Sequence, residues 1–203
     1  MDIVFVLVEP ARGENIGAAA RAIKTMGFKE LRLVNPGDMR AAQWVAHHSN
    51  DVLEQAVIVD TLDQALADVD LSIACTARHR LQKDRYVDAD RCAELVAGKG
   101  NSVQRVAIVF GREASGLTGE EVARCDLASS IPLAQAQPSL NLGQAVMVYA
   151  GKPQHMGGQV AVGINPAFLV LEVKAGNAKA VNRVFLARGE MAVNPYEGAA
   201  GGK

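Results

Sequence analysis

The sequence predicts an α/β fold in which a parallel β-sheet carries helices on both faces. Apolar, β-branched segments of strand length alternate along the chain with segments that show helical periodicity. The strand-like segments are nearly continuous apolar runs, which is typical of parallel strands buried on both faces. Of the 203 residues, 49% are apolar and 21% are charged, so the chain can bury a sizeable core and differs from disordered proteins.

The N-terminal part begins with the strand Ile3–Val8, an unbroken run of β-branched and other apolar residues. A helix is expected over Asn15–Met26, where apolar residues recur at helical spacing and Gly27 stands where a C-cap glycine belongs. The next expected elements are a strand over Leu31–Val34, a helix over Ala41–His48, a short strand over Val57–Val59 and a helix over Leu62–Ala67.

The middle of the chain contains the clearest strand, Val106–Phe110. Before it we expect a strand over Leu71–Cys75, a charged loop over Arg78–Tyr86 and a short helix over Cys92–Ala97. After it we expect a helical turn over Gly119–Arg124, a short strand over Ala128–Ile131 and an apolar helix over Asn141–Ala150.

The chain changes character after Ala150. The sequence Gly151-Lys152-Pro153 should end the preceding helix, and residues 151–203 hold nine of the 19 glycines. We therefore divide the chain into a domain of residues 1–150 and a C-terminal segment of residues 151–203. In that segment, Gln159–Gly163 and Ala167–Lys174 are candidate strands.

Composition and motifs exclude several classes of protein. No apolar run approaches the roughly 18 residues that span a bilayer. Three scattered cysteines and four histidines show neither a disulfide framework nor metal-ligand spacing, so we expect no metal and a reducing, cytoplasmic compartment. The glycine motifs that bind dinucleotides or nucleoside triphosphates are missing from the sequence. A net charge of −1 argues against a strongly basic nucleic-acid module but leaves RNA open.

Three polar segments follow predicted strands, at the edge where open parallel sheets bind ligands: Glu14–Arg21, Phe110–Leu117 and Gln137–Val146. Each also has a purely structural interpretation: Asn15 as a helix N-cap beside a surface arginine, a glycine-rich connection, and a helix capped by Ser139 or Asn141. In the second segment, a carboxylate directly after a buried strand costs free energy unless it has partners, which favours a functional role for Glu113. Gly116 is expected to allow close approach to the backbone.

Taken together, the three segments resemble a known family. Asn15-Ile16-Gly17-x3-Arg21, Phe110-Gly111-x-Glu113-x2-Gly116-Leu117 and Ser139-Leu140-Asn141-Leu142 resemble motifs 1, 2 and 3 of the SpoU (TrmH-like) branch of the SPOUT methyltransferases. Val8-Glu9-Pro10 and the stretch Arg21–Gly27 resemble the TrmJ-like subgroup, which methylates tRNA. The resemblance covers residues 1 to about 150. It implies a SPOUT-type α/β knot with a deep C-terminal trefoil knot, which is an exception to the rule that chains are unknotted, and a homodimer.

The resemblance also implies an activity and its residues. The activity is transfer of a methyl group from S-adenosylmethionine to a ribose 2′-hydroxyl of RNA, with tRNA (the anticodon loop among its possible targets) favoured over rRNA. The implied cofactor-binding residues are Phe110, Gly111, Glu113, Gly116, Ile131, Leu140, Asn141 and Ala145. The implied catalytic residues are Arg21, Asn15, Glu113, Ser139 and Asn141. The alternative is a non-catalytic knotted protein that binds RNA or cofactor and is inactivated by its atypical C-terminus.

Arg21 is placed at the reacting hydroxyl by the resemblance. A 2′-hydroxyl has a high pKa, so it needs a proton acceptor and stabilisation of the developing oxyanion. An arginine pKa above about 12 disfavours Arg21 as the base, so we assign it to hold the phosphate and stabilise the oxyanion. Glu113 and water remain the candidate proton acceptors. The resemblance also implies that the first motif of one subunit can face the other subunit's cofactor, so that Arg21 could act across a dimer.

The charged loop Arg78–Tyr86 is the best candidate for RNA contact. Arg78, Arg80, Lys83 and Arg85 would contact phosphates and Tyr86 would stack on a base, although a solvated surface loop is an equally simple interpretation.

The chain departs from the family pattern after Ala150. Family members continue the third-motif helix into the dimer interface, whereas Gly151-Lys152-Pro153 interrupts it here. One hypothesis is a shifted reading frame beyond codon 150.

Overall fold

The computed structural model describes residues 1–78, 86–133, 140–151, 154–156 and 159–161. The chain forms two compact units, Met1–Gly163 and Ile164–Lys203. The second unit, the candidate strand Ala167–Lys174 within it, and the residues Arg80, Lys83, Arg85 and Ser139 lie outside the described residues. The domain boundary predicted at residue 150 stays a prediction.

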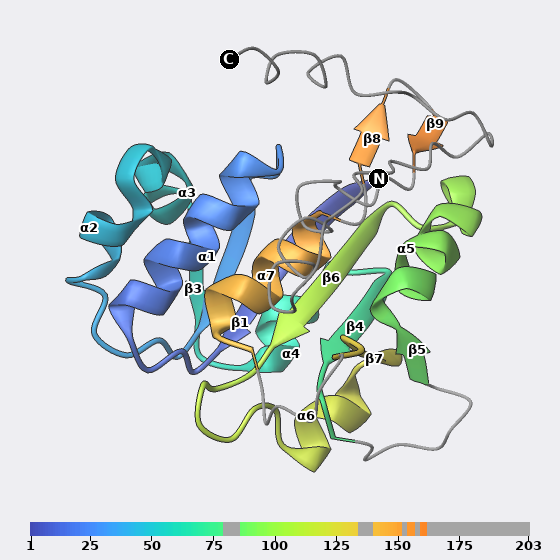
Figure 1. The fold of residues 1–203 in the computed structure, drawn as a ribbon. Helices are drawn as coiled ribbons and strands as arrows, with labels where there is room; N and C mark the ends of the chain where they lie inside the picture. Colours follow the sequence, from blue (N-terminus) through green and yellow to red (C-terminus); the bar gives the residue numbers. More distant parts are fainter. Residues whose placement is uncertain (79–85, 134–139, 152–153, 157–158, 162–203) are drawn as a thin grey trace, which may run out of the picture. The chain divides into compact units, whose positions relative to one another are not determined.

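A seven-stranded sheet forms the centre of the first unit, with the strand order β3-β2-β1-β6-β4-β7-β5 and every neighbouring pair parallel (Figure 1). The strands are β1 (Asp2–Val8), β2 (Glu30–Val34), β3 (Val57–Val59), β4 (Leu71–Cys75), β5 (Tyr86–Asp88), β6 (Arg105–Phe110) and β7 (Leu127–Ser130). The predicted parallel α/β architecture is confirmed. The central strand β6 and its neighbour β1 correspond to two continuous apolar runs of the sequence, Val106–Phe110 and Ile3–Val8.

Both faces of the sheet are buried beneath helices. Successive side chains of β1 belong to different core clusters: the cluster of Phe5 includes residues of α1, α5 and α7, whereas the cluster of Val6 includes residues of α4 and α6. The helices are α1 (Gly13–Thr25), α2 (Ala42–Ala46), α3 (Asn50–Glu54), α4 (Leu62–Leu66), α5 (Ala89–Gly98), α6 (Gly119–Arg124) and α7 (Leu142–Ala150), with short 3-10 turns at His47–Ser49 and Gly100–Ser102. None of the described helices is long and apolar enough to cross a membrane.

Apart from the 3-10 turns, two short elements before α7 were not predicted, α3 and the edge strand β5. Each is too short to show a periodicity, and β5 pairs only with β7, over residues 86–88. The helix predicted over Ala41–His48 is interrupted, because His47 has φ +49°, and the chain continues as a 3-10 turn.

The end of the third-motif helix is confirmed. The helix α7 ends at Ala150, and Gly151 is its C-cap residue. Beyond it, β8 (Gln154–Met156) and β9 (Gln159–Ala161) form a two-stranded antiparallel hairpin, and β9 covers the first part of the strand predicted over Gln159–Gly163.

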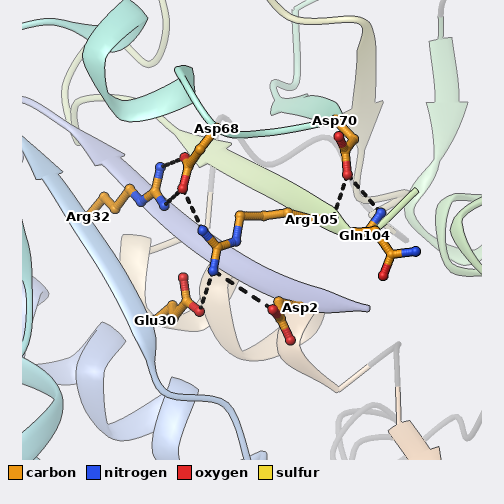
Figure 2. A network of polar contacts seen from close by, with 7 residues as sticks. All are labelled: Asp2, Glu30, Arg32, Asp68, Asp70, Gln104 and Arg105. Atoms are coloured by element: carbon orange, nitrogen blue, oxygen red, sulfur yellow. Dashed lines mark hydrogen bonds and ion pairs between the residues drawn. The ribbon is translucent and has the colours of Figure 1, made fainter. Parts of the chain in front are cut away.

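A network of charged side chains joins the strands at the edge of the sheet where they begin (Figure 2). The buried Arg32 of β2 donates two hydrogen bonds to Asp68, at 2.5 and 2.9 Å, and one to the carbonyl oxygen of Ala65 at 2.6 Å. Arg105 of β6 pairs with Asp68 and with Glu30 of β2. Hydrogen bonds from Arg32 and then from Arg105 hold the pKa of Asp68 well below its usual range, so the network stays charged at neutral pH.

Candidate active site

A cavity of about 260 Å³ opens at the carboxyl edge of the sheet, opposite the network of Figure 2. Its walls come from the ends of β4, β6 and β7, from the loop of residues 111–117 and from the start of α7. Seven of the eight predicted cofactor-binding residues line it: Phe110, Gly111, Glu113, Gly116, Ile131, Leu140 and Ala145. The eighth, Asn141, lines an adjoining hollow that shares Glu113 and Leu140 with the first. Residues that are far apart in the sequence are therefore gathered around one site.

The loop after β6 depends on two glycines for different reasons. A Cβ atom on Gly111 would lie 2.2 Å from both the carbonyl carbon of Gly116 and the backbone nitrogen of Leu117, so no side chain fits there. Gly116 has φ +67°, a conformation that favours glycine, and no atom lies within 4 Å of its hypothetical Cβ. The chain thus approaches itself at Gly111, and the approach of a ligand at Gly116 stays a prediction.

Glu113 is the centre of the polar contacts at the site. Its Oε2 accepts a hydrogen bond from the backbone N–H of Ala11 at 3.0 Å, and its Oε1 accepts from the N–H of Arg12 at 3.3 Å and from Nδ2 of Asn15 at 2.8 Å. Oδ1 of Asn15 in turn accepts from Nδ2 of Asn141 at 2.9 Å. One residue from each of the three motif segments therefore belongs to a single hydrogen-bonded chain.

These bonds decide how Glu113 ionises. Burial alone would raise the pKa of Glu113, but the hydrogen bonds from Asn15 and from backbone N–H groups outweigh it, so the pKa lies below its ordinary value. Glu113 is consequently a carboxylate at neutral pH and a weaker proton acceptor than a free glutamate.

The N-cap interpretation of Asn15 is wrong. The helix α1 begins at Gly13, and Arg12 precedes it without a side-chain cap. Asn15 lies within the first turn and its amide is turned toward Glu113 and Asn141 instead. The cap predicted for α7 is confirmed, because Oδ1 of Asn141 accepts from the N–H of Gly143 at 2.9 Å.

Arg112 was missed by the sequence analysis, although it holds the 111–117 loop to its surroundings. Its guanidinium pairs with Glu9 at the end of β1, at 2.7 Å, and with Glu121 of α6, at 3.0 Å. It also lies 3.4 Å from the carbonyl oxygen of Gly116. Contacts with Glu121 and Glu9 raise the pKa of Arg112, so the ion pairs persist at neutral pH. The available signal was its position inside the second motif, between Gly111 and Glu113.

Small residues of the first and third motifs bring three helices close together. A Cβ atom on Gly17 of α1 would lie 2.3 Å from the carbonyl oxygen of Ala42 in α2. A Cβ atom on Gly143 of α7 would lie 2.7 Å from Cβ of Ala18 in α1. The small residues at the start of α1 and α7 therefore allow the chain's own helices to pack closely.

Other predicted residues lie apart from this chain of contacts. Arg21 is exposed on α1, about 9 Å further along the helix axis than Asn15, and lines neither hollow. Arg78 lines the cavity itself. The hydroxyl of Tyr86 donates to the carbonyl oxygen of Arg78 at 2.7 Å, which ties the two ends of the charged loop together. Within the part of the chain that the structure describes, no three His, Cys, Asp or Glu side chains gather as metal ligands would.

The sequence model of the SpoU rRNA Methylase family matches residues 2–151. The chain belongs to this family. A protein of Escherichia coli K12, named uncharacterized tRNA/rRNA methyltransferase LasT, is 48% identical over 151 residues, which are 73% of this chain and 66% of that protein. The tRNA (cytidine/uridine-2′-O-)-methyltransferase TrmJ of Yersinia pestis Pestoides F is 40% identical over 151 residues, 73% of this chain and 58% of that protein. This SpoU family chain thus spans 58–66% of the length of these two relatives.

Solved structures support the same placement within the SpoU family. A probable methylase family protein of Haemophilus influenzae Rd KW20 superposes with a TM-score of 0.69 at 33% identity, covering 89% of this chain and 72% of that one. TrmJ of Z. mobilis ZM4 superposes with a TM-score of 0.68 at 33% identity, covering 74% and 67%. The SPOUT-type α/β fold is confirmed. Because residues 134–139 lie outside the described chain, the trefoil knot stays a prediction.

Proposed function

We propose that this chain is an S-adenosylmethionine-dependent RNA methyltransferase that acts on a ribose 2′-hydroxyl, with tRNA favoured over rRNA. The observation that carries the proposal is the meeting of all three motif segments beside the cavity and its adjoining hollow, through the hydrogen bonds that join Glu113, Asn15 and Asn141. Membership of the SpoU family and similarity to proteins named as tRNA methyltransferases support it.

The lining of the cavity suits S-adenosylmethionine. Phe110, Ile131 and Leu140 provide apolar walls for a flat heterocycle, and the glycine-rich loop presents backbone polar groups. Arg78 and Glu113 supply opposite charges for a ligand that carries both a carboxylate and cationic groups. When bound, the cofactor supplies an activated methyl group on a sulfonium.

The protein's own residues would then position the hydroxyl and accept its proton. Because its pKa is lowered, Glu113 serves better as the anchor of Asn15 than as the base, which favours water as the proton acceptor. Arg21 would bind the phosphate and stabilise the oxyanion. Its exposed position, away from both hollows of its own chain, supports action in the site of a partner subunit within a homodimer.

Arg78 and the charged loop that it begins would extend the RNA surface, since Arg78 already borders the cofactor cavity. Arg80, Lys83, Arg85 and Tyr86 complete this proposed contact. We place the activity in the cytoplasm, where its RNA substrates are found.

The non-catalytic alternative is favoured by one observation: α7 ends at Ala150, with Gly151 as its C-cap residue. Titration calorimetry with S-adenosylmethionine, followed by transfer of a tritiated methyl group to unfractionated tRNA and rRNA, separates the two. Binding of S-adenosylmethionine together with methyl transfer to RNA supports the enzyme, provided that an RNA whose ribose is already 2′-O-methylated accepts no further methyl group. Binding without transfer to either RNA would favour the alternative.

A further inference from the structure

The single tryptophan of the chain, Trp44, is placed where packing does not require it. Its side chain is 82% exposed, the highest value among the exposed large apolar residues of the described chain. It belongs to α2, whose buried residues Ala42 and Ala46 already hold the helix against the core. Leaving so large an apolar side chain in water forgoes the stabilisation that its burial would give. A binding role would explain this position.

Trp44 and Arg21 belong to two helices, α2 and α1, that pack against each other. The hypothetical Cβ of Gly17 lies 3.0 Å from Cβ of Val45, the neighbour of Trp44, so α2 crosses α1 at Gly17. Further along α1, Nζ of Lys24 donates to the carbonyl oxygen of His48, just beyond α2, at 2.7 Å. Arg21 is one helical turn after Gly17 and one before Lys24, so it lies on the side of α1 along which α2 and the 3-10 turn after α2 run.

The charges of this surface leave a cation unpaired. Asp38 is paired with Arg40, and Asp51 is paired with Lys24. Within the described residues Arg21 has no ion-pair partner, and Glu14, also exposed, stands about two turns earlier on α1. The exposed neighbours of Trp44 are polar rather than apolar, namely Gln43, His47 and His48. A protein partner would be expected to cover a continuous apolar patch, whereas one aromatic ring beside free positive charge suits a nucleic acid strand.

On this basis we propose that Trp44 stacks on an unpaired base of the RNA substrate, close to the nucleotide whose phosphate Arg21 holds. This inference rests on the proposed function, and it adds that the substrate is single-stranded at this point. Every base presents a π-face to an aromatic ring, but only an unpaired, unstacked base leaves that face free. Because Trp44 and Arg21 share one chain's surface, they would contact the same RNA whichever subunit provides the cofactor.

The lone tryptophan makes the test direct, because all tryptophan fluorescence comes from this residue. We expect single-stranded poly(A) to quench the fluorescence and to protect it from acrylamide, and the poly(A)·poly(U) duplex to do so much less. Trp44→Ala should raise the Kd for poly(A) and the KM for unfractionated tRNA by about 5- to 100-fold. Trp44→Phe should restore most of the affinity, since a smaller ring still stacks. Ile58→Ala, at a similarly apolar and 59% exposed position on β3, is the matched control and should change neither constant.

Three results would overturn the inference. Wild-type fluorescence that does not change when poly(A) is added, together with an unchanged KM in Trp44→Ala and continued methylation of tRNA, would show that Trp44 does not touch RNA while leaving the proposed function intact. Protection from acrylamide that rises with protein concentration before RNA is added would assign Trp44 to a second copy of the chain. Equal effects of single-stranded and duplex RNA would exclude stacking. Failure of the wild-type protein to methylate any RNA would instead refute the proposed function.

Discussion

Replacing Glu113 by glutamine tests whether its negative charge, rather than its shape, holds the first and second motif segments together. The carboxylate accepts three hydrogen bonds, all from N–H donors: the backbone of Ala11 and Arg12 and the side chain of Asn15. Glutamine keeps one acceptor oxygen and turns an NH2 group toward at least one of these donors. At least one bond is lost, and a donor then faces a donor.

The expected loss in the free energy of unfolding follows from the type and the exposure of these hydrogen bonds. Hydrogen bonds to a charged acceptor contribute roughly 1.5–3 kcal/mol, but the two backbone donors are exposed enough to regain water. We therefore expect Glu113→Gln to lower the free energy of unfolding by about 2 kcal/mol. For a unit of this size, that corresponds to a fall of roughly 4–8 °C in Tm.

The pH dependence has a definite sign. The pKa of Glu113 is lower in the folded than in the unfolded protein, so its charge stabilises the fold above the ordinary glutamate pKa of 4.5. That stabilisation is lost as the pH falls through the folded-state pKa. The difference in Tm between wild type and Glu113→Gln should be constant near neutral pH and shrink in acid.

Thermal unfolding followed by circular dichroism at several pH values measures this difference. Glu94→Gln, at an exposed position on α5, is the matched control and should unfold with wild type throughout. Equal Tm values for wild type and Glu113→Gln at neutral pH, or a difference that persists undiminished in acid, would refute the reasoning.

Three further variants test the proposed site. Arg21→Ala should abolish methyl transfer and leave the Kd for S-adenosylmethionine within about twofold in calorimetry, with Arg91→Ala on α5 as control; an equal loss of affinity and rate would contradict the assigned role. Asn141→Ala removes the cap of α7 and the bond to Asn15, so it should cost about 1 kcal/mol of stability and weaken cofactor binding; an unchanged Kd would place the pocket elsewhere. The third variant replaces the loop cations Arg78, Arg80, Lys83 and Arg85 together. It should lower the salt slope of RNA binding by roughly 0.7–0.9 per lost phosphate contact and raise the KM for RNA. Unaltered RNA binding at every salt concentration would show that the loop is only a solvated surface.

The fold was predictable from the sequence where the pattern is local and long. The strands β1 and β6 are continuous apolar runs, and α1 has a full apolar stripe ending at Gly27, so all three were found within two residues of their bounds. The helix and strands that were missed, α3, β5 and β8, are three to five residues long and owe their existence to the neighbours that they pack against or pair with.

The site was predictable as a set of residues but not as a set of contacts. Asn15 and Glu113 are 98 positions apart, and nothing near Asn15 in the sequence reveals that its amide turns toward a loop after β6 rather than toward its own helix. Arg112 shows the same limit, because its partners Glu9 and Glu121 come from the end of β1 and from α6. Side-chain pairing across a sheet edge depends on which strands become neighbours, and the sequence pattern does not contain that information directly.

The hydrogen-bonded chain from Glu113 through Asn15 to Asn141 has a direction, and the groups at its two ends require the same one. An ionised carboxylate can only accept, so the amide of Asn15 must point its NH2 toward Glu113 and its oxygen toward Asn141. Asn141 must then offer its own NH2 to Asn15, which leaves its oxygen free to face the N–H of Gly143 and cap α7. A protonated Glu113 could donate to Asn15, but turning both amides over would then place the NH2 of Asn141 against the N–H of Gly143, a donor against a donor. The ionised carboxylate after β6 and the cap of α7 therefore require the same orientation of both amides.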